Sequence, residues 1–122
     1  MLTFGNTTRV YLATGATDMR KGFEGLFAKV HETMRLDPLS GHLFVFCNRT
    51  RTRIKVLYWD GSGLWVCAKR LEKGCFAWPN AQSGPLPPPQ ISLTQAQWTL
   101  LVAGMDLRGV KERKWHRVDR LE

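Results

Sequence analysis

Three apolar runs in the middle of the chain follow one another at short spacing, and this spacing limits the folds open to the protein. The runs cover 42–47, 54–59 and 64–70 and are rich in aromatic and β-branched residues, which favour strands. Connections this short join antiparallel neighbours, because a parallel crossover needs about a dozen residues or more. We therefore expect an antiparallel meander at the centre of the sheet.

The turn between the second and third runs determines which of their side chains share a sheet face. Asp60–Gly63 reads Asp-Gly-Ser-Gly, residues that tolerate positive φ, so Trp59 and Leu64 are predicted to pair across a tight hairpin. One sheet face then carries Val56, Tyr58, Trp65 and Cys67, and the other carries Leu57, Trp59, Val66 and Ala68. Both faces are largely apolar. Either helices cover both, or one face is left as an exposed aromatic surface for bases or a partner protein.

A first helix is predicted over residues 18–34, capped by Thr17 or Asp18. Its apolar stripe is formed by Met19, Phe23, Leu26, Phe27, Val30 and Met34. Gly22 and Gly25 interrupt this pattern, each at a cost of roughly 1 kcal/mol relative to alanine. Either the helix starts later than residue 18, or a neighbouring backbone packs closely against it.

The second half of the chain contains a proline-rich stretch followed by another helix. Residues 79–90 are predicted to be a linker or an extended arm that holds no regular ladder or helix, because each proline lacks an N–H and fixes φ. Thr94 and Gln97 then fit a capping box, and Gly104 ends the helix that follows. Trp98 and Leu101 on this helix are suited to cover a second sheet face.

These elements define an α+β fold. Short strands are also predicted at 9–13 and 75–78, giving an antiparallel meander sheet of four to five strands with two helices. With 122 residues, the chain is expected to form a single compact domain over 1–108, followed by a basic tail at 109–122.

The charge balance favours an anionic partner. Eighteen Lys and Arg against ten Asp and Glu leave a formal net charge of +8, which attracts polyanions such as DNA. The alternative is a solvated basic surface that only maintains solubility. Which of the two holds depends on where the basic residues gather.

Candidate phosphate-binding residues fall into three clusters and the basic tail. They are Arg20 and Lys21; Arg49, Arg51, Arg53 and Lys55; Lys69, Arg70 and Lys73; and, in the tail, Lys111, Arg113, Lys114, Trp115 and Arg117. The first pair is expected near a helix N-terminus, and the second group is expected to present several guanidinium groups at one end of the sheet. In the tail, the tryptophan suits stacking on a base, with a frayed terminus as the alternative. The sequence leaves open whether these clusters are contiguous.

Four sequence blocks carry a resemblance to a known family. They are 9–22, 40–46, 54–64 and 68–79. Together they resemble the small accessory protein, TnpB or the second open reading frame product, of bacterial insertion sequences of the sixty-six family. The resemblance implies a role in DNA transposition beside a larger transposase that holds the acidic catalytic residues. The resemblance names the process, and the residues argue the role. The basic patches favour a non-catalytic accessory factor that binds DNA, and an exposed aromatic face would instead suit an adaptor that docks on the transposase without touching DNA.

Other functional classes find little support in the sequence. Asp18 is interpreted as a helix cap, Asp60 as a turn residue and Glu72 as an exposed strand-end charge, which leaves no carboxylate set for catalysis. The three cysteines lack C-x-x-C spacing, and Cys47 and Cys67 are interpreted as core residues, so no metal is expected. No cofactor, small-molecule substrate or membrane contact is expected. With no targeting or membrane-spanning segment, the predicted location is cytoplasmic.

Overall fold

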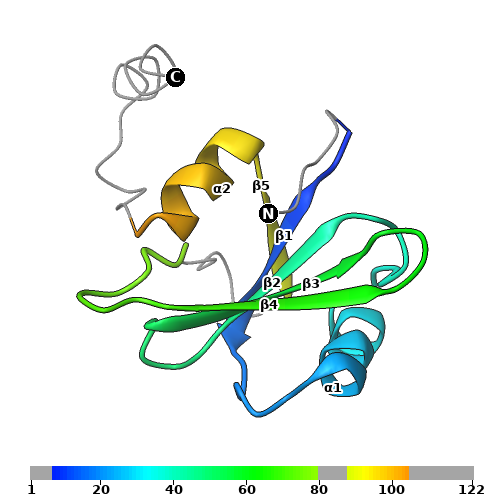
Figure 1. Cartoon of the computed structure of the whole chain (residues 1–122), viewed down its shortest axis with the longest axis horizontal. Coiled ribbons are helices and arrows are strands. Elements are labelled where there is room, and N and C mark those ends of the chain that lie inside the picture. Colours follow the sequence, from blue (N-terminus) through cyan, green and yellow to red (C-terminus); the bar gives the residue numbers. More distant parts are fainter. Residues whose placement is uncertain (1–6, 80–87, 105–122) are drawn as a thin grey trace.

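The computed structural model, which describes residues 7–79 and 88–104, contains a mixed five-stranded sheet in the order β4-β3-β2-β1-β5, with a helix on each face (Figure 1). The elements are β1 (Val10–Ala16), α1 (Phe23–Ala28), β2 (Leu43–Cys47), β3 (Arg53–Trp59), β4 (Leu64–Arg70), β5 (Gln90–Leu93) and α2 (Gln95–Val102). A π-helical turn over Lys29–Thr33 extends α1. The α+β class is confirmed.

The central meander is confirmed strand by strand. β2 pairs with β3, and β3 with β4, both antiparallel. The register between β3 and β4 is unbroken from Arg53 opposite Arg70 to Trp59 opposite Leu64. The short connections therefore produced the two hairpins that their lengths predicted.

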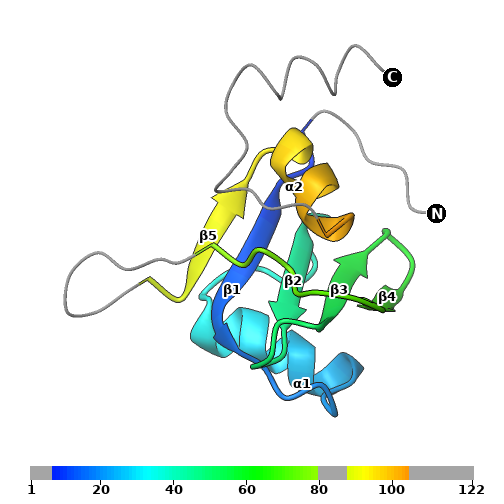
Figure 2. The same cartoon turned by 90° about the vertical axis from the view of Figure 1, so that its left-hand side faces the viewer.

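The sheet is not antiparallel throughout. β1 runs parallel to β2, and α1 lies in the connection between them, which is long enough for a crossover. Figure 2 shows the strands side by side, with β1 between β2 and β5. The predicted meander was wrong for this one pair, because it was inferred from the short central connections alone.

Two other local predictions, one of a strand and one of a linker, were also wrong. Residues 75–78 form no strand, although Phe76 is buried and donates its N–H to the Arg51 carbonyl. Gln90, expected to lie in the proline-rich linker, begins β5 opposite Ala13. The ladder extends towards the prolines because a proline carbonyl still accepts hydrogen bonds, and that of Pro89 accepts the Thr14 N–H at 3.1 Å. Residues 80–87 of the predicted linker lie outside the described residues.

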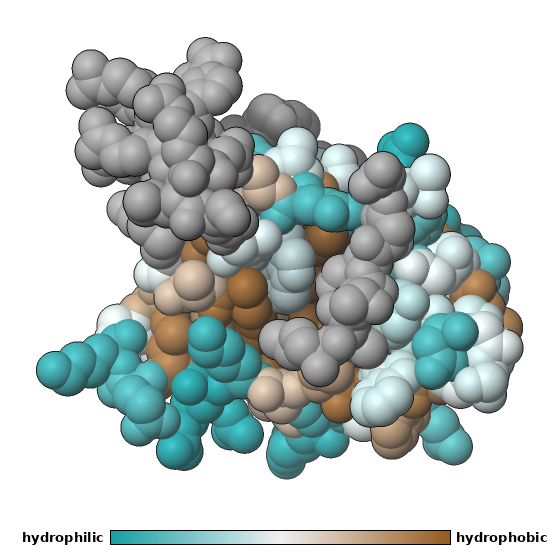
Figure 3. Space-filling view, turned by 45° about the horizontal axis from the view of Figure 1, so that its top comes forward, coloured by the Kyte–Doolittle hydropathy of each residue, from teal (hydrophilic) through white to brown (hydrophobic). Residues whose placement is uncertain are grey.

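Both faces of the sheet are covered, which decides between the two arrangements left open by the sequence. On one face the buried cluster comprises Val10, Leu12, Leu43, Val45, Cys47, Ile54, Val56, Phe76 and Leu101, with Trp98 packed against it. On the other it comprises Ala13, Leu26, Val30, Met34, Phe44, Phe46 and Leu57. We call these the α2 face and the α1 face. Seen from the α2 side, hydrophobic residues gather centrally and hydrophilic residues lie at the lower left (Figure 3).

The first helix begins later than residue 18. α1 starts at Phe23 after Gly22, and Asp18 accepts the N–H of Arg20 instead of capping a helix. This local hydrogen bond competes with helix formation, as aspartate side chains often do. One consequence is that Phe23, predicted to be buried, is 52% exposed, whereas Leu26, three residues later, is fully buried.

The second helix begins and ends as predicted. Thr94 accepts the Gln97 N–H at 3.1 Å, and the Gln97 side chain accepts the Thr94 N–H at 3.0 Å, which completes the capping box. Gly104 adopts a φ of +86° just after the C-cap residue Ala103. Positive φ is readily reached by glycine and ends the helix.

The β3–β4 hairpin is organised by one carboxylate. Asp60 accepts the backbone N–H groups of Ser62 and Gly63 at 2.8 and 2.9 Å, and the indole N–H of Trp65 at 2.8 Å. The backbone hydrogen bond from Ser62 and the one from the Trp65 indole are the main reasons that the pKa of Asp60 lies well below its usual value. The charged carboxylate therefore stabilises the turn.

The packing of α1 and α2 on the two sheet faces can be tested by truncating one fully buried leucine in each helix. Leu26→Ala in α1 and Leu101→Ala in α2 should each lower the free energy of unfolding by about 3 kcal/mol, because both side chains are completely buried. Leu39→Ala is the control, since Leu39 is 45% exposed and should change it by less than about 0.5 kcal/mol. Urea unfolding measures all three. A cost for Leu101→Ala no larger than that of the control would contradict the packing of α2.

The hairpin carboxylate predicts a pH dependence. Asp60→Asn should lower the melting temperature near neutral pH, because the native turn hydrogen-bonds the charged form. A lowered native pKa stabilises the fold above the unfolded-state value of about 4 and loses this effect as the pH falls further. The difference between wild type and variant should therefore be constant above that pH and shrink below it. Thermal unfolding across pH measures this, and a difference that grew in acid would contradict it.

Candidate nucleic-acid interface

One end of the β3–β4 hairpin extends beyond the apolar cluster on the α1 face. Leu57 and Val66 lie opposite each other and pack in the cluster that contains α1. Further along the same face, Lys55 lies opposite Ala68 and Arg53 opposite Arg70. The apolar surface under α1 thus gives way to a surface with three cations.

Two neighbouring hollows follow this surface. The first, of about 330 Å³, is lined by Met19, Arg53, Ile54, Lys55, Ala68, Lys69, Arg70 and Glu72. The second, of about 380 Å³, is lined by Ala16, Thr17, Asp18, Met19, Asn48, Arg49, Thr50 and Arg53. Met19 and Arg53 line both hollows, so we treat them as one feature and call it the basic groove.

The pairing of Arg53 with Arg70 is the most unusual feature of the groove. The two residues stand directly opposite each other at a position where the two strands do not exchange hydrogen bonds, and side chains approach most closely at such positions. Like charges directly opposite each other destabilise a sheet. Arg70 has partial relief from Glu72 at 3.6 Å, but both side chains of that ion pair are largely exposed, so it contributes little. A bound anion would relieve the repulsion.

Asn48 shapes the loop that presents Arg49 and Arg53. Its side-chain oxygen accepts the N–H groups of Thr52 and Arg53 at 2.9 and 3.1 Å, and its amide donates to the hydroxyls of Thr50 and Thr52. Sequence reasoning missed this role. The available signal was an asparagine directly after a strand, because asparagine side chains readily hydrogen-bond the backbone of the turn that follows.

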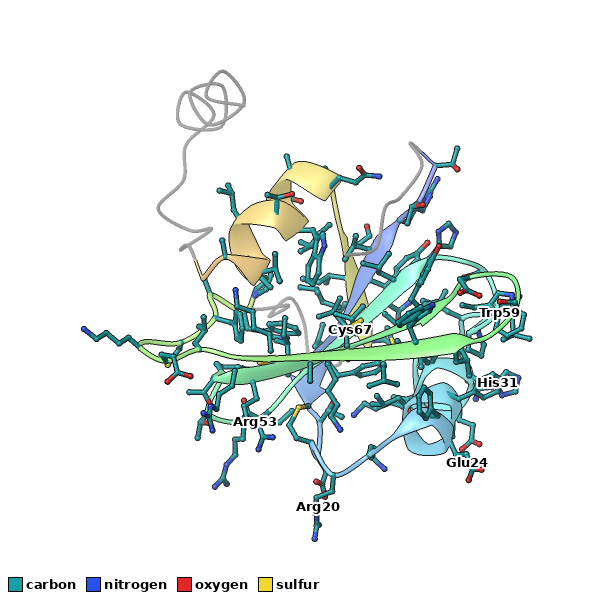
Figure 4. The ribbon with its side chains drawn as sticks, viewed as in Figure 1. Arg20, Glu24, His31, Arg53, Trp59 and Cys67 are labelled. Atoms are coloured by element: carbon teal, nitrogen blue, oxygen red, sulfur yellow. The ribbon has the colours of Figure 1, made fainter. Side chains whose placement is uncertain are left out.

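Arg20 and Lys21 lie in the loop before α1 and line neither hollow, but each contacts a residue that does. They were predicted to lie in the first turn of the helix, and the later start of α1 corrects that placement. Figure 4 shows Arg20 and Arg53 on the same side of the sheet as α1. The Lys21 carbonyl accepts the Lys55 ammonium at 2.9 Å, which ties the loop to β3. Arg20 pairs with Asp18 at 2.7 Å, and its hydrogen bonds hold the pKa of Asp18 well below its usual range.

Arg51 does not join the other guanidinium groups of the turn that were expected to gather at one end of the sheet. Its guanidinium carbon lies 5.5 Å from the ring centroid of Trp78, and the Trp78 indole donates to the Ala13 carbonyl. Its Nη1 is buried without a hydrogen-bond partner among the described residues. Arg51 therefore holds the 71–79 segment against the α2 face.

The third basic cluster is divided in the same way. Arg70 and Lys69 both line the first hollow of the groove. Lys69, however, lies opposite Ile54 of the α2-face cluster, and its ammonium donates to the Val102 carbonyl at 2.7 Å. Lys73 is exposed and lines neither hollow. The remaining candidates, in the tail, lie outside the described residues: Lys111, Arg113, Lys114, Trp115 and Arg117.

Two of the three cysteines pack with core residues. Cys47 is buried and Cys67 packs against the α2-face cluster, as predicted. Burial raises the pKa of the Cys47 thiol, and a hydrogen bond with Arg51 partly opposes that shift. Within residues 7–79 and 88–104, no three His, Cys, Asp or Glu side chains gather as metal ligands would. No helix in that part of the chain is long and apolar enough to cross a membrane.

Comparison with known proteins supplies the family. The family model of IS66 Orf2-like proteins, TnpB of IS66 elements, matches residues 8–112. The chain belongs to this family. This membership confirms the resemblance seen in the sequence blocks and implies an accessory role associated with transposition of an insertion sequence.

Two relatives of this Orf2-like protein come from Sinorhizobium fredii (strain NBRC 101917 / NGR234). The uncharacterized protein y4hO is 43% identical over 112 residues, which cover 92% of this chain and 93% of y4hO. The uncharacterized protein y4jC is 37% identical over 105 residues, which cover 86% of each chain. No solved structure matches the chain.

The inward position of Arg51 predicts a stability effect. Arg51→Ala should lower the free energy of unfolding by about 1 kcal/mol, because it removes the contact with Trp78. Arg49→Ala is the matched control on the exposed side of the same loop and should cost less than about 0.5 kcal/mol. Urea unfolding compares the two. If Arg51→Ala left stability unchanged but weakened retention on heparin, the guanidinium would face solvent anions instead.

Proposed function

We propose that this Orf2-like protein assists transposition as a non-catalytic factor that binds DNA by contacting phosphates along the basic groove. The observation that carries the proposal is the placement of Arg53 opposite Arg70 on one sheet face. Two arginines directly opposite each other destabilise the unliganded hairpin, and a phosphate between them turns that repulsion into two charge-assisted contacts.

The chemistry of the groove suits a phosphate backbone. Arg49 and Arg53 are exposed and form no ion pair within the described part of the chain. A guanidinium presents a planar fork that matches two phosphate oxygens. Because such contacts fix position without reading bases, they supply affinity that depends on salt and little on sequence.

A non-catalytic role agrees with the surroundings of the carboxylates. Asp18 pairs with Arg20, Asp60 organises the β3–β4 turn and Glu72 pairs weakly with Arg70. Phosphodiester cleavage by metal ions would require carboxylates that converge on a shared site. We assign such chemistry to the element's transposase and place this protein beside it on DNA in the cytoplasm.

Exposed aromatic side chains favour a second candidate, an adaptor that docks on the transposase without direct DNA contact. Phe23 and Trp65 are 52% and 49% exposed, and aromatic residues often anchor protein interfaces. In that case the basic groove only adds to the net charge. Retention of the transposase after nuclease digestion, lost in Trp65→Ala, would favour this candidate.

Fluorescence-anisotropy titration tests the groove. The probes are a duplex from the element's terminal repeat and a scrambled duplex, each over a salt series. Arg49→Gln combined with Arg53→Gln should weaken binding about tenfold or more and reduce the salt slope by about two, one for each lost phosphate contact. A stronger affinity for the terminal repeat would add base readout to the phosphate contacts.

The matched control removes the same charge elsewhere. Arg9→Gln combined with Arg35→Gln also deletes two exposed arginines, neither of which lines the groove. This double variant should retain the salt slope of the wild type. Equal losses in both double variants would mean that net charge alone drives binding, and no binding by the wild type at moderate salt would leave the transposase adaptor as the function.

A further inference from the structure

The two edges of the sheet differ in how they are protected. β5 is a four-residue strand that directly follows Pro88 and Pro89, and short strands and prolines discourage further pairing. β4 has seven residues, contains no proline and keeps an unbroken register with β3. Within the described residues, no strand lies beside β4 on the side away from β3. The β4 edge therefore has none of the features that blunt the β5 edge.

The hydrogen bonds at both ends of the hairpin show which backbone groups of β4 point away from β3. The Asp60 N–H donates to the Gly63 carbonyl, and the Leu71 N–H donates to the Thr52 carbonyl. Antiparallel strands alternate between pairs that exchange such bonds and pairs that do not. Alternating the two kinds of pair from either end of the hairpin assigns the same β4 residues to the outward side. The groups directed away from β3 belong to Leu64, Val66, Ala68 and Arg70.

We propose that the β4 edge pairs with β4 of a second copy of this chain, forming a continuous ten-stranded sheet across a two-fold axis at Cys67. Full overlap of the two strands places Leu64 opposite Arg70 of the second copy and Val66 opposite Ala68 of the second copy. These are the residues with outward backbone groups, so each pair exchanges two hydrogen bonds. The register thus satisfies all the donors and acceptors that the two strands direct away from β3.

Side-chain chemistry favours a second copy as the occupant. Two basic strands would repel if their cations met, but this register sets Arg70 beside the uncharged Leu64 and Lys69 beside Trp65 of the second copy. Trp65 is half exposed in the single chain, and the aliphatic stem of a lysine packs well on an indole. The apolar stretch from Leu64 to Ala68 lies at the centre of the new interface. The register therefore keeps the cations of the two strands apart and places apolar residues opposite each other at the centre.

The pairing has a geometric consequence for the groove. A two-fold axis perpendicular to the sheet keeps the α1 faces of both copies on the same side. Arg70 and its counterpart in the second copy then lie about 20 Å apart along the strand direction, from the rise per residue of a β-strand. Both basic grooves open on one surface of the dimer. The pairing itself does not depend on DNA binding, so either proposal can fail without the other.

Disulfide trapping tests the register. Cys67 and Cys67 of the second copy form a pair without exchanged hydrogen bonds, whose Cα atoms lie about 4.5 Å apart, within the range for a disulfide. Mild oxidation of nuclease-treated full-length protein in high salt should give a species of twice the 14.0 kDa chain mass on a non-reducing gel. Cys67→Ala should abolish this species. Cys75→Ala is the control and should retain it, although Cys75 is the exposed cysteine.

Removing one outward N–H tests the pairing itself. Val66→Pro deletes a donor that the single sheet does not use, so the variant should keep its circular dichroism spectrum but become monomeric by light scattering. Val66→Ala is the control that shortens the side chain, keeps the N–H and should remain dimeric. A monomeric wild type, a dimer unaffected by Val66→Pro, or cross-linking through Cys75 would each overturn the proposal. If Val66→Pro does not fold, cross-linking at Cys67 decides it.

Discussion

β2 is the constraint on which the rest of the structure depends. All five of its residues, Leu43–Cys47, are buried, so neither face of this strand can be left to water. α1 covers one face, and α2 covers the other with help from Phe76. Because β2 lies at the centre of the sheet, both of its backbone edges are also paired, with β1 and β3. The crossover helix, the β3–β4 hairpin and α2 can each be understood as cover for this strand.

The sequence predicted features that depend on neighbouring residues and missed those that depend on distant ones. The β3–β4 hairpin and the capping box at Thr94 are local, so their residues specify them directly. The parallel pairing of β1 depends on segments far apart in the chain, and no short pattern encodes it. The prediction of where α1 starts was wrong for a different reason. Asp18 suits a helix cap and a local turn equally well, and its hydrogen bond to Arg20 formed the turn.

The candidate site shows the same limit. Alternation along a strand predicted that basic residues would gather at one end of the sheet, but not which way each would point. Arg51, in the turn, lies over Trp78 on the α2 face, whereas Arg53, in the strand, lines the groove. The placement of Arg53 opposite Arg70 also depends on the register of two strands. The net charge alone does not distinguish these basic residues. In the structure, some of them pack against the fold and others lie on a face suited to anions.

The pairing of β1 with β5 bears on how the chain folds as it is synthesised. Val10 lies opposite Leu93, so one edge of β1 stays open until nearly all of the described chain has left the ribosome. The β2–β4 meander involves only neighbours and can form before then, since local contacts lose less chain entropy on closure. An early intermediate would expose both β1 and the unfinished α2 face to other nascent chains. Formation of β5 and α2 covers the open edge of β1 and the α2 face together. The vulnerable stage therefore ends when the last described segment folds.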